Sequence, residues 1–161
     1  MNEIDEKWMR AAVRLAQNAA EIGEVPIGAC VVGPDGLLVA AAFNRTIHNN
    51  DPTAHAEILA IRIAGEMLDN YRLIGTTVYS TIEPCAMCAG ALVNARVSRL
   101  VYGAKDERYG AVDTHFGIGI TDVLNHRIEV VSGVLAGECR TLMQDFFRRR
   151  RTAGVAASDQ T

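Results

Sequence analysis

The sequence has no excess of positive charge and no long hydrophobic segment. Its 161 residues hold 16 lysines and arginines against 19 aspartates and glutamates, which gives a net charge of -3 at pH 7. This balance excludes a protein that binds nucleic acid over a broadly basic surface. No segment approaches the roughly eighteen apolar residues that a membrane-spanning helix needs. The first residues, MNEIDEKWMRAA, lack the apolar core of a signal peptide, so we expect a cytoplasmic protein with no membrane partner.

Cysteine is scarce as well. The four cysteines are too few and too unevenly spaced for a secreted domain that depends on disulfides. Hydrophobic residues make up 49 % of the chain, so a core can form without a metal to hold the fold together. The length suits one domain, which we place at residues 1–151, and we expect residues 152–161 to form a disordered tail.

The hydrophobic pattern alternates between helical and strand periods. Helices are predicted at 6–22, from 49–53 to about 67, at 84–94 and at 138–151, and strands at 27–33, 36–43, 76–82, 98–104 and 127–133. Pro34, Asp35 and Gly36 form a turn between the first two strands, and an uncertain short helix is expected within the glycine-rich 104–125 loop. A hairpin followed by strand–helix–strand units predicts an α/β domain with a mixed sheet of about five strands.

Two short stretches carry residues suited to metal chemistry. NDPTAHAEILA contains His55 and Glu57, and EPCAMCAGAL contains Cys85 and Cys88, each at an expected helix start. Cysteines three apart share one face of a helix, and the positive end of the helix dipole favours their thiolates. His55 and Glu57 lie about 200° apart around a helix, so they converge only on a point beyond its end. The two stretches therefore predict two helix N-termini aimed at one ion.

The number of ligands favours chemistry over structure. His55, Cys85 and Cys88 supply three soft or borderline ligands of the kind that zinc prefers, whereas a structural zinc is normally closed by four. Glu57 is better placed to carry protons beside such an ion than to bind it. His48 and His115 remain as possible fourth ligands. Cys30 and Cys139 are expected to pack in the core.

An H-x-E motif followed by P-C-x-x-C is the signature of zinc nucleobase deaminases. The segments DPTAHAEI, NYRLIGTTVYSTIEPCAMCAGAL, NHRIEV and DFFRRR resemble the bacterial tRNA-specific adenosine deaminases, a family of the cytidine-deaminase-like superfamily. The resemblance covers roughly residues 6–151. It implies a three-layer α/β/α fold, a homodimer and one Zn²⁺ per subunit held by His55, Cys85 and Cys88.

The resemblance also implies a reaction and a set of substrate contacts. The family hydrolyses adenosine to inosine at the wobble position of a tRNA anticodon, breaking a C–N bond of a cyclic amidine. Zinc-bound hydroxide would attack C6 while Glu57 moves protons. The positions matching the family's substrate contacts are Asn44, Val25 within EVPIGA, Glu83 and Pro84, and Lys105 with Asp106.

The C-terminal helix ends in FFRRRR, four arginines beside two aromatic residues. Arginine pairs with phosphate and aromatic rings stack on unpaired bases, so we expect Phe147 and Arg148 to contact RNA. Arginines also suit the negative end of a helix, and the two rings can pack in the core. Both roles are compatible with a local basic patch on an acidic protein.

One segment departs from the family pattern. Where the family has a loop of small residues resembling GAxGS, this chain has GAVDTHFGIGITDVLNHR from Gly110, with Asp113 and Thr114 followed by His115 and Phe116. Variation within a loop explains the difference without a change of substrate. The alternative is a deaminase of a free base or nucleoside, of guanine or cytosine type, with the same metal site. A zinc-stabilised binding module without catalysis would require a fourth protein ligand.

Overall fold

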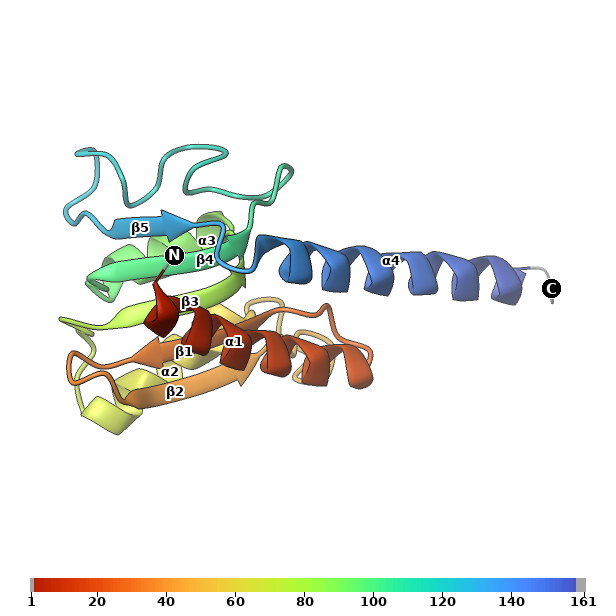
Figure 1. Ribbon diagram of the computed structural model, residues 1–161, viewed down its shortest axis with the longest axis horizontal. Helices are drawn as coiled ribbons and strands as arrows, with labels where there is room; N and C mark the ends of the chain where they lie inside the picture. The colour runs from red at the N-terminus through yellow and green to blue at the C-terminus, as the bar shows by residue number, and fades with distance from the viewer. Residues whose placement is uncertain (1, 159–161) are drawn as a thin grey trace.

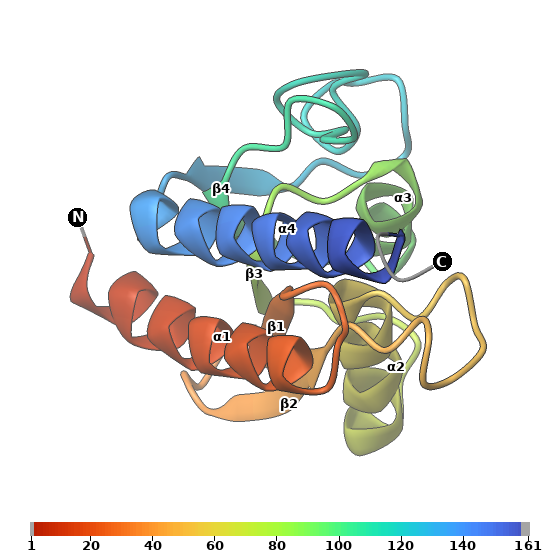
Figure 2. The same cartoon turned by 90° about the vertical axis from the view of Figure 1, so that its right-hand side faces the viewer.

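The computed structural model describes residues 2–158 and shows one sheet between two pairs of helices (Figure 1). The elements in chain order are α1 (Glu3–Glu21), β1 (Gly28–Val32), β2 (Leu38–Phe43), α2 (Ala56–Leu68), β3 (Thr77–Ile82), α3 (Ala86–Asn94), β4 (Arg99–Ala104), β5 (Glu129–Ser132) and α4 (Ala136–Ser158). Helices α1 and α4 cover one face of the sheet, and α2 and α3 cover the other (Figure 2). The predicted α/β/α layering is confirmed.

The strand order brings several loops to one edge of the sheet. The strands lie in the order β2-β1-β3-β4-β5; β1 is antiparallel to β2 and β3, whereas β3, β4 and β5 are parallel. The carboxyl ends of β3 and β4 therefore meet at the same edge as the start of β1 and the end of β2. The segment before Gly28 ends at this edge, and the segments after Phe43, Ile82 and Ala104 begin there. Together they contain most of the predicted site residues.

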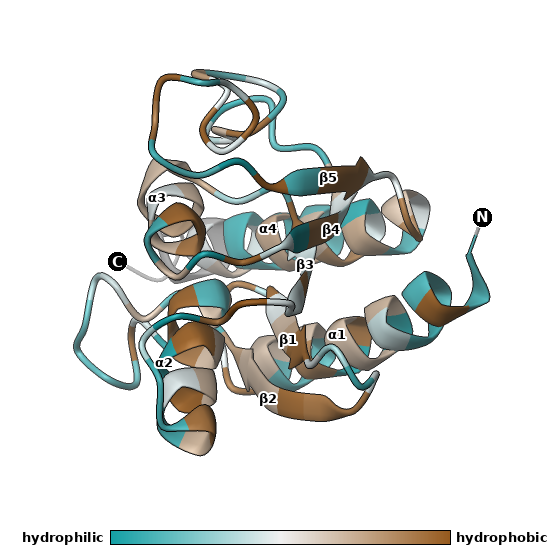
Figure 3. Cartoon of the chain, turned by 90° about the vertical axis from the view of Figure 1, so that its left-hand side faces the viewer, coloured by the Kyte–Doolittle hydropathy of each residue, from teal (hydrophilic) through white to brown (hydrophobic). Residues whose placement is uncertain are grey.

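Alternation along the strands divides the core into two parts. Ala29 and Val31 of β1 pack with the α2 and α3 side, whereas Cys30 and Val32 pack with the α1 and α4 side. Figure 3 shows hydrophobic colour on the strands and on bands of the helices, and further hydrophobic stretches in the loop between β4 and β5. This two-residue period is what a sheet covered on both faces requires.

A buried ionic cluster attaches α1 to the sheet. Arg99 of β4 donates two hydrogen bonds of 2.7 Å to the carboxylate of Asp5, and the Tyr79 hydroxyl donates a third at 2.9 Å. Asp5 is 2 % exposed, and the Arg99 guanidinium, the largest influence, holds the pKa of its carboxyl below the usual value. A buried carboxylate with this many donors stabilises the docking of α1.

Several predicted boundaries differ from the structure. Helix α2 begins at Ala56 and not at 49–53, because the Asp51 carboxylate accepts bonds from the Thr53 amide (2.8 Å) and hydroxyl (2.7 Å) and closes a separate turn before the helix. The segment between β4 and β5 consists of turns and bends, so the short helix expected there is absent from residues 105–128. Helix α4 continues past Arg151 to Ser158 through an alanine-rich stretch, where the sequence predicts a tail; residues 159–161 lie outside the described part.

None of the helices within residues 2–158 is both long enough and apolar enough to cross a membrane.

Candidate metal centre and its surroundings

His55 and Cys85 occupy equivalent places at the starts of two helices. His55 is the N-cap residue of α2 and Cys85 is that of α3, and neither side chain caps its own helix. Both residues have the extended backbone that is usual at an N-cap, with ψ of 152° and 176°. Cys88 lies in the first turn of α3 and is fully buried. Because the two side chains leave the capping role unfilled, they can serve a common ligand.

The three side chains converge. Nδ1 of His55 lies 3.6 Å from Sγ of Cys85 and 3.4 Å from Sγ of Cys88, and all the ligating atoms lie within 4.8 Å of one another. In a tetrahedral zinc site with these ligand types, neighbouring donor atoms are about 3.3–3.8 Å apart, given Zn–N and Zn–S bonds of about 2.0 and 2.3 Å. The donor set and its spacing therefore fit a zinc ion without rearrangement of the backbone.

The electrostatic surroundings favour a thiolate within the group. Hydrogen bonding from Cys88 and, to a smaller extent, from His55 lowers the pKa of Cys85 to about 4. The pKa of Cys88 is raised, by its bond to Cys85 and by burial, so this pair shares a proton. The pKa of His55 is also raised, mainly by its bond to Cys85. A divalent cation would replace the shared proton, because metal and proton compete for the same sulfur and nitrogen atoms.

Glu57 is buried beside this group with no partner for one of its oxygens. Its side chain is 2 % exposed, and Oε1 makes no hydrogen bond within residues 2–158. Burial is the largest influence on its pKa and raises it; the Cys85 thiolate also raises it, and His55 opposes this. A carboxylic group that accepts a proton readily and has a free oxygen suits proton transfer to a bound molecule.

The other histidines and cysteines have different partners. Nε2 of His115 lies 2.9 Å from the carbonyl of Glu107, and Nδ1 of His48 lies 3.4 Å from Glu24. Cys30 and Cys139 are buried in the core on the α1 and α4 side, as predicted. Neither histidine is therefore placed as a fourth ligand of the metal group. Among the described residues, His55, Cys85 and Cys88 form the single such cluster.

The predicted pocket residues Val25 and Asn44 lie at the same sheet edge. Asn44 is 4 % exposed, and its backbone N–H donates to the carbonyl of Ile27 at 3.0 Å, just beyond the β1–β2 pairing. Val25 is half-buried in the preceding segment. The adjoining Glu24 is fully buried, and its Oε1 accepts bonds from the amides of Ile47 (2.7 Å) and His48 (3.3 Å). Glu24 thus fixes the loop that leads to His55.

The side chain of Glu83 anchors a loop, a role that its place in the sequence did not indicate. Its side chain is 1 % exposed and turns toward the loop after β4. Oε2 accepts from the amides of Val112 (3.3 Å), Asp113 (3.1 Å) and Thr114 (3.0 Å), and Oε1 accepts from the Thr114 hydroxyl (2.6 Å). Burial raises the pKa of Glu83, but these bonds together outweigh it, so the pKa is lowered. Glu83 is a loop anchor beside the metal group.

The Lys105-Asp106 segment follows directly on β4. Lys105 is exposed, whereas Oδ1 of Asp106 accepts bonds from the amides of Arg108 (3.0 Å) and Tyr109 (3.1 Å). The Asp106 amide in turn faces Oε1 of Glu83 at 3.4 Å. The aspartate therefore shapes a turn, and the lysine is free to meet an anion. Pro84 is buried, and its carbonyl accepts the amide of Ala111 at 2.9 Å.

Helix α4 carries the predicted RNA contacts on its projecting half. Figure 1 shows α4 extending beyond the sheet, in the direction in which β3 and β4 point. Phe147 is 38 % exposed, and Arg148 is exposed and paired with Asp145. Arg150 lies over the Phe146 ring at 5.4 Å, beside a surface groove between α4 and the end of α1 that Arg149 also lines. The groove is separate from the metal group.

The chain is similar to known zinc-binding deaminases, in agreement with the geometry of the site. Residues 2–104 match the family described as the cytidine and deoxycytidylate deaminase zinc-binding region. The chain is 45 % identical to the tRNA-specific adenosine deaminase of Haemophilus influenzae over 150 residues, covering 93 % of this chain and 87 % of that protein.

Solved structures also resemble this chain. One comes from work on A-to-I editing by tRNA:A34 deaminases at the wobble position; it is 43 % identical with a TM-score of 0.81, covering 84 % of this chain and 98 % of its own. Another is the guanine deaminase of Nitrosomonas europaea, which is 28 % identical with a TM-score of 0.73, covering 88 % and 83 % of the two chains.

Proposed function

The chain belongs to the cytidine and deoxycytidylate deaminase family, and from that we propose that it is a zinc-dependent tRNA adenosine deaminase. Its reaction would be the hydrolysis of the wobble adenosine of an anticodon to inosine, with release of ammonia. The observation that carries the proposal is the buried, unpartnered Oε1 of Glu57 beside three converging metal ligands. This arrangement places a side chain that can transfer protons at the point where a water molecule and the target nucleobase can meet.

His55, Cys85 and Cys88 would hold the zinc. Zinc bound there supplies a Lewis acid that makes a water molecule more acidic. Three protein ligands leave one position of a tetrahedron for that water. The ligands come from the starts of two helices packed on the same face of the sheet, so their positions depend on the fold and not on a flexible loop.

Glu57 would move the protons of the reaction. It takes one proton from the attacking water and places it on the ring nitrogen of adenine, and it then takes the second proton from the added hydroxyl and delivers it to the amine that leaves as ammonia. Its raised pKa suits a group that must both accept and donate. Asn44 and Val25, at the same sheet edge, would orient the base. Adenosine and water are consumed, and inosine and ammonia are formed.

Two observations favour RNA as the substrate. The relative of 45 % identity is a tRNA-specific adenosine deaminase, and the match spans 93 % of this chain. Helix α4 presents exposed arginines and Phe147 beyond the edge of the sheet where the metal group lies. Arginine and aromatic side chains together suit the phosphates and unpaired bases of an anticodon loop. An acidic protein can bind RNA through such a local patch.

A guanine deaminase activity is the second candidate, because the Nitrosomonas europaea enzyme shares the fold at 28 % identity. The test is to incubate zinc-loaded protein with an anticodon stem-loop carrying a wobble adenosine, and separately with guanine, cytosine, adenine and their nucleosides. Inosine in the stem-loop supports the proposal, and turnover of guanine alone would replace it. Metal analysis of the same preparation should give one zinc per chain.

The cytoplasm, where tRNA is found, is the compartment that this function requires. We also expect a homodimer, since α2 exposes Ile63, Met67 and Leu68 at 39 %, 68 % and 44 %. Apolar side chains clustered on one helix are typical of a surface between subunits. Light scattering that gives a mass of about twice the 17.4 kDa chain would support this, and a monomer at micromolar concentration would contradict it.

A further inference from the structure

The loop Gly110–Ile120, in which this chain departs from the family pattern, is held by the two residues that precede the candidate ligand Cys85. The Ala111 amide donates to the carbonyl of Pro84 at 2.9 Å, and the amides of Asp113 and Thr114 donate to Glu83. Pro84 and Glu83 immediately precede the candidate ligand Cys85. The position of the loop is therefore set by the same segment that positions the metal.

Within this loop Phe116 has an unusual backbone. The amide of Gly117 donates to the carbonyl of His115 at 2.7 Å, which makes a three-residue turn centred on Phe116, whose φ is 62°. A γ-turn with positive φ is rare and strained, and a bulky residue in this region is an outlier. The amide of Ile118 donates to the carbonyl of Ala111 at 2.9 Å and closes the loop behind the turn. Such strain persists where the surroundings impose it, often at binding sites.

The side chains on either side of this turn are held, whereas Phe116 is free. Asp113 accepts a hydrogen bond from Tyr102, and Thr114 donates to Glu83. His115 is tied to the Glu107 carbonyl, and its ring lies 6.1 Å from the ring of Phe116 at an angle of 52°. Phe116 itself is 83 % exposed. The loop thus presents one aromatic face to solvent on a well-anchored backbone.

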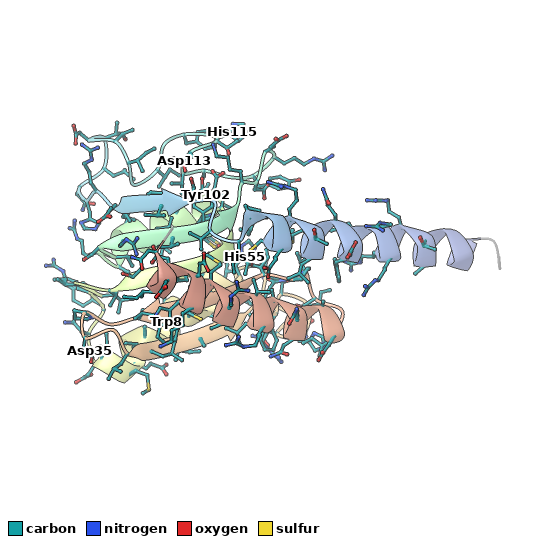
Figure 4. The ribbon with its side chains drawn as sticks, in the orientation of Figure 1. Trp8, Asp35, His55, Tyr102, Asp113 and His115 are labelled. Carbon is teal, nitrogen blue, oxygen red and sulfur yellow. The ribbon has the colours of Figure 1, made fainter. Side chains whose placement is uncertain are left out.

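The neighbourhood of Phe116 suits a single-stranded nucleic acid. Lys105 and Arg108, in the turn that precedes the loop, are both exposed, with Asp106 and the exposed Glu107 between them, and Tyr109 is 68 % exposed. Figure 4 shows Asp113 and His115 on the segment after β4, and Thr114 between them donates to Glu83, two residues before Cys85. Exposed aromatic faces flanked by positive charge are how proteins bind unpaired bases without reading their sequence.

Resting on the proposed function, we propose that Phe116 is a stacking platform for an unpaired nucleotide next to the target adenosine. Once the target base has left the stack, its neighbour loses one stacking partner, and the Phe116 ring can replace it. The strained turn keeps the backbone of Phe116 in place before the RNA arrives, so little backbone ordering remains to be done on binding. The departure from the family loop then adds a base contact, and the metal group is unchanged.

The test measures RNA affinity in a Glu57→Gln background, so that the stem-loop is not consumed. Phe116→Ala should weaken binding about tenfold, the usual loss for one base stacked on an aromatic ring. Phe116→Tyr should retain the parent affinity. The matched control is Tyr71→Ala, which removes another exposed ring (78 %) just beyond the C-terminal end of α2 and should change nothing. Thermal unfolding of each variant checks that the fold is retained.

The nucleotide is identified by removing its base. An abasic residue on one side of the target should cost the parent about tenfold and cost Phe116→Ala little, because the contact has already been lost. Equal affinity of Phe116→Ala and parent, or losses that add at both flanking positions, would overturn the stacking platform. With Glu57 restored, inosine formation by the wild type tests the proposed function separately. A wild type that edits the stem-loop while Phe116→Ala binds normally would refute the platform alone.

Discussion

Glu57 and Glu83 are two buried glutamates beside the same metal group, and their surroundings differ completely. Glu57 is 2 % exposed and its Oε1 has no partner within residues 2–158, whereas Glu83 is 1 % exposed and accepts bonds through both oxygens. The pKa of Glu57 is raised by burial, and that of Glu83 is lowered because its hydrogen bonds outweigh burial. Both side chains are shielded from solvent, and Glu83 is the one whose two oxygens accept a set of hydrogen bonds that stabilises its charged form.

The difference in hydrogen bonding separates a role in proton transfer, for Glu57, from a structural role, for Glu83. A buried carboxylate with a full set of donors has its charge stabilised and holds other groups in place. A buried carboxylate with an unpartnered oxygen is costly to the fold, and such a cost is usually retained where a ligand or a proton completes the site. Asp5, with Arg99 and Tyr79 as donors, belongs with Glu83 although it lies on the opposite face of the sheet.

The largest effect is expected from Glu57→Gln. The amide cannot carry protons, so inosine formation should fall about a thousandfold or more. Zinc should remain at one per chain, since the ligands are untouched. The measurement pairs single-turnover kinetics with metal analysis. Substantial remaining activity would remove Glu57 from proton transfer and erase the contrast with Glu83.

Glu83→Gln should act through the loop and not through the reaction. One of the two oxygens becomes an NH₂ group that faces backbone amides, and loss of charged hydrogen bonds of this kind costs about 2 to 3 kcal/mol of unfolding free energy. The KM for the stem-loop should rise while zinc content stays normal and the saturated rate changes less than with Glu57→Gln. If Glu83→Gln lowered the saturated rate as much as Glu57→Gln, the division of roles would be wrong.

Gly110→Ala should reproduce the Glu83 effect from the other side of the contact. A Cβ at Gly110 would lie 2.4 Å from Cδ of Glu83 and 2.5 Å from the Asp106 carbonyl, so the carboxylate or the backbone must move. We expect a loss of about 1 to 3 kcal/mol. Combined with Glu83→Gln, the loss should be less than additive, because both changes release one anchor. Denaturant unfolding of the two single variants and the double variant checks this, and full additivity would argue against a shared contact.

Asp5→Asn tests a satisfied carboxylate far from the site and should have the smallest effect on activity. The folded-state pKa of Asp5 is lowered, first by Arg99, so the charged form stabilises the fold above the unfolded value of 3.8. At pH 7 the variant should be about 2 kcal/mol less stable. The gap should close as the pH falls below 3.8 toward the folded value. A gap independent of pH would show that the ionised form contributes nothing.

The sequence predicted the metal group because its signals are local. Proline before each helix and ligands in or next to the first turn make His55 and Cys85 converge wherever the two helices pack side by side. The parallel strands and the β1–β2 hairpin were also predictable from period and turn residues. The start of α2 was misplaced because Asp51 closes a turn on Thr53, a choice that residue type alone does not decide.

The loop anchors could not be predicted in the same way. The donors to Glu83 are backbone amides of residues 112–114, about thirty positions away along the chain, and every non-proline residue carries such a donor. The backbone of Phe116 was equally hidden, since a positive φ at phenylalanine has no residue signal of the kind that glycine gives. The departure from the family pattern at 113–120 was visible, but the bonds that join Asp113 to Tyr102 and Thr114 to Glu83 were not.

The central claim is that Glu57, beside a three-ligand zinc, deaminates an adenosine in RNA. The most direct measurement is mass spectrometry of the nucleosides from an anticodon stem-loop incubated with wild type, Glu57→Gln and Glu83→Gln under zinc saturation. The account predicts inosine at the wobble position with wild type, almost none with Glu57→Gln, and formation with Glu83→Gln that recovers at high RNA concentration. Wild-type protein that leaves the stem-loop unchanged but releases ammonia from guanine would contradict it.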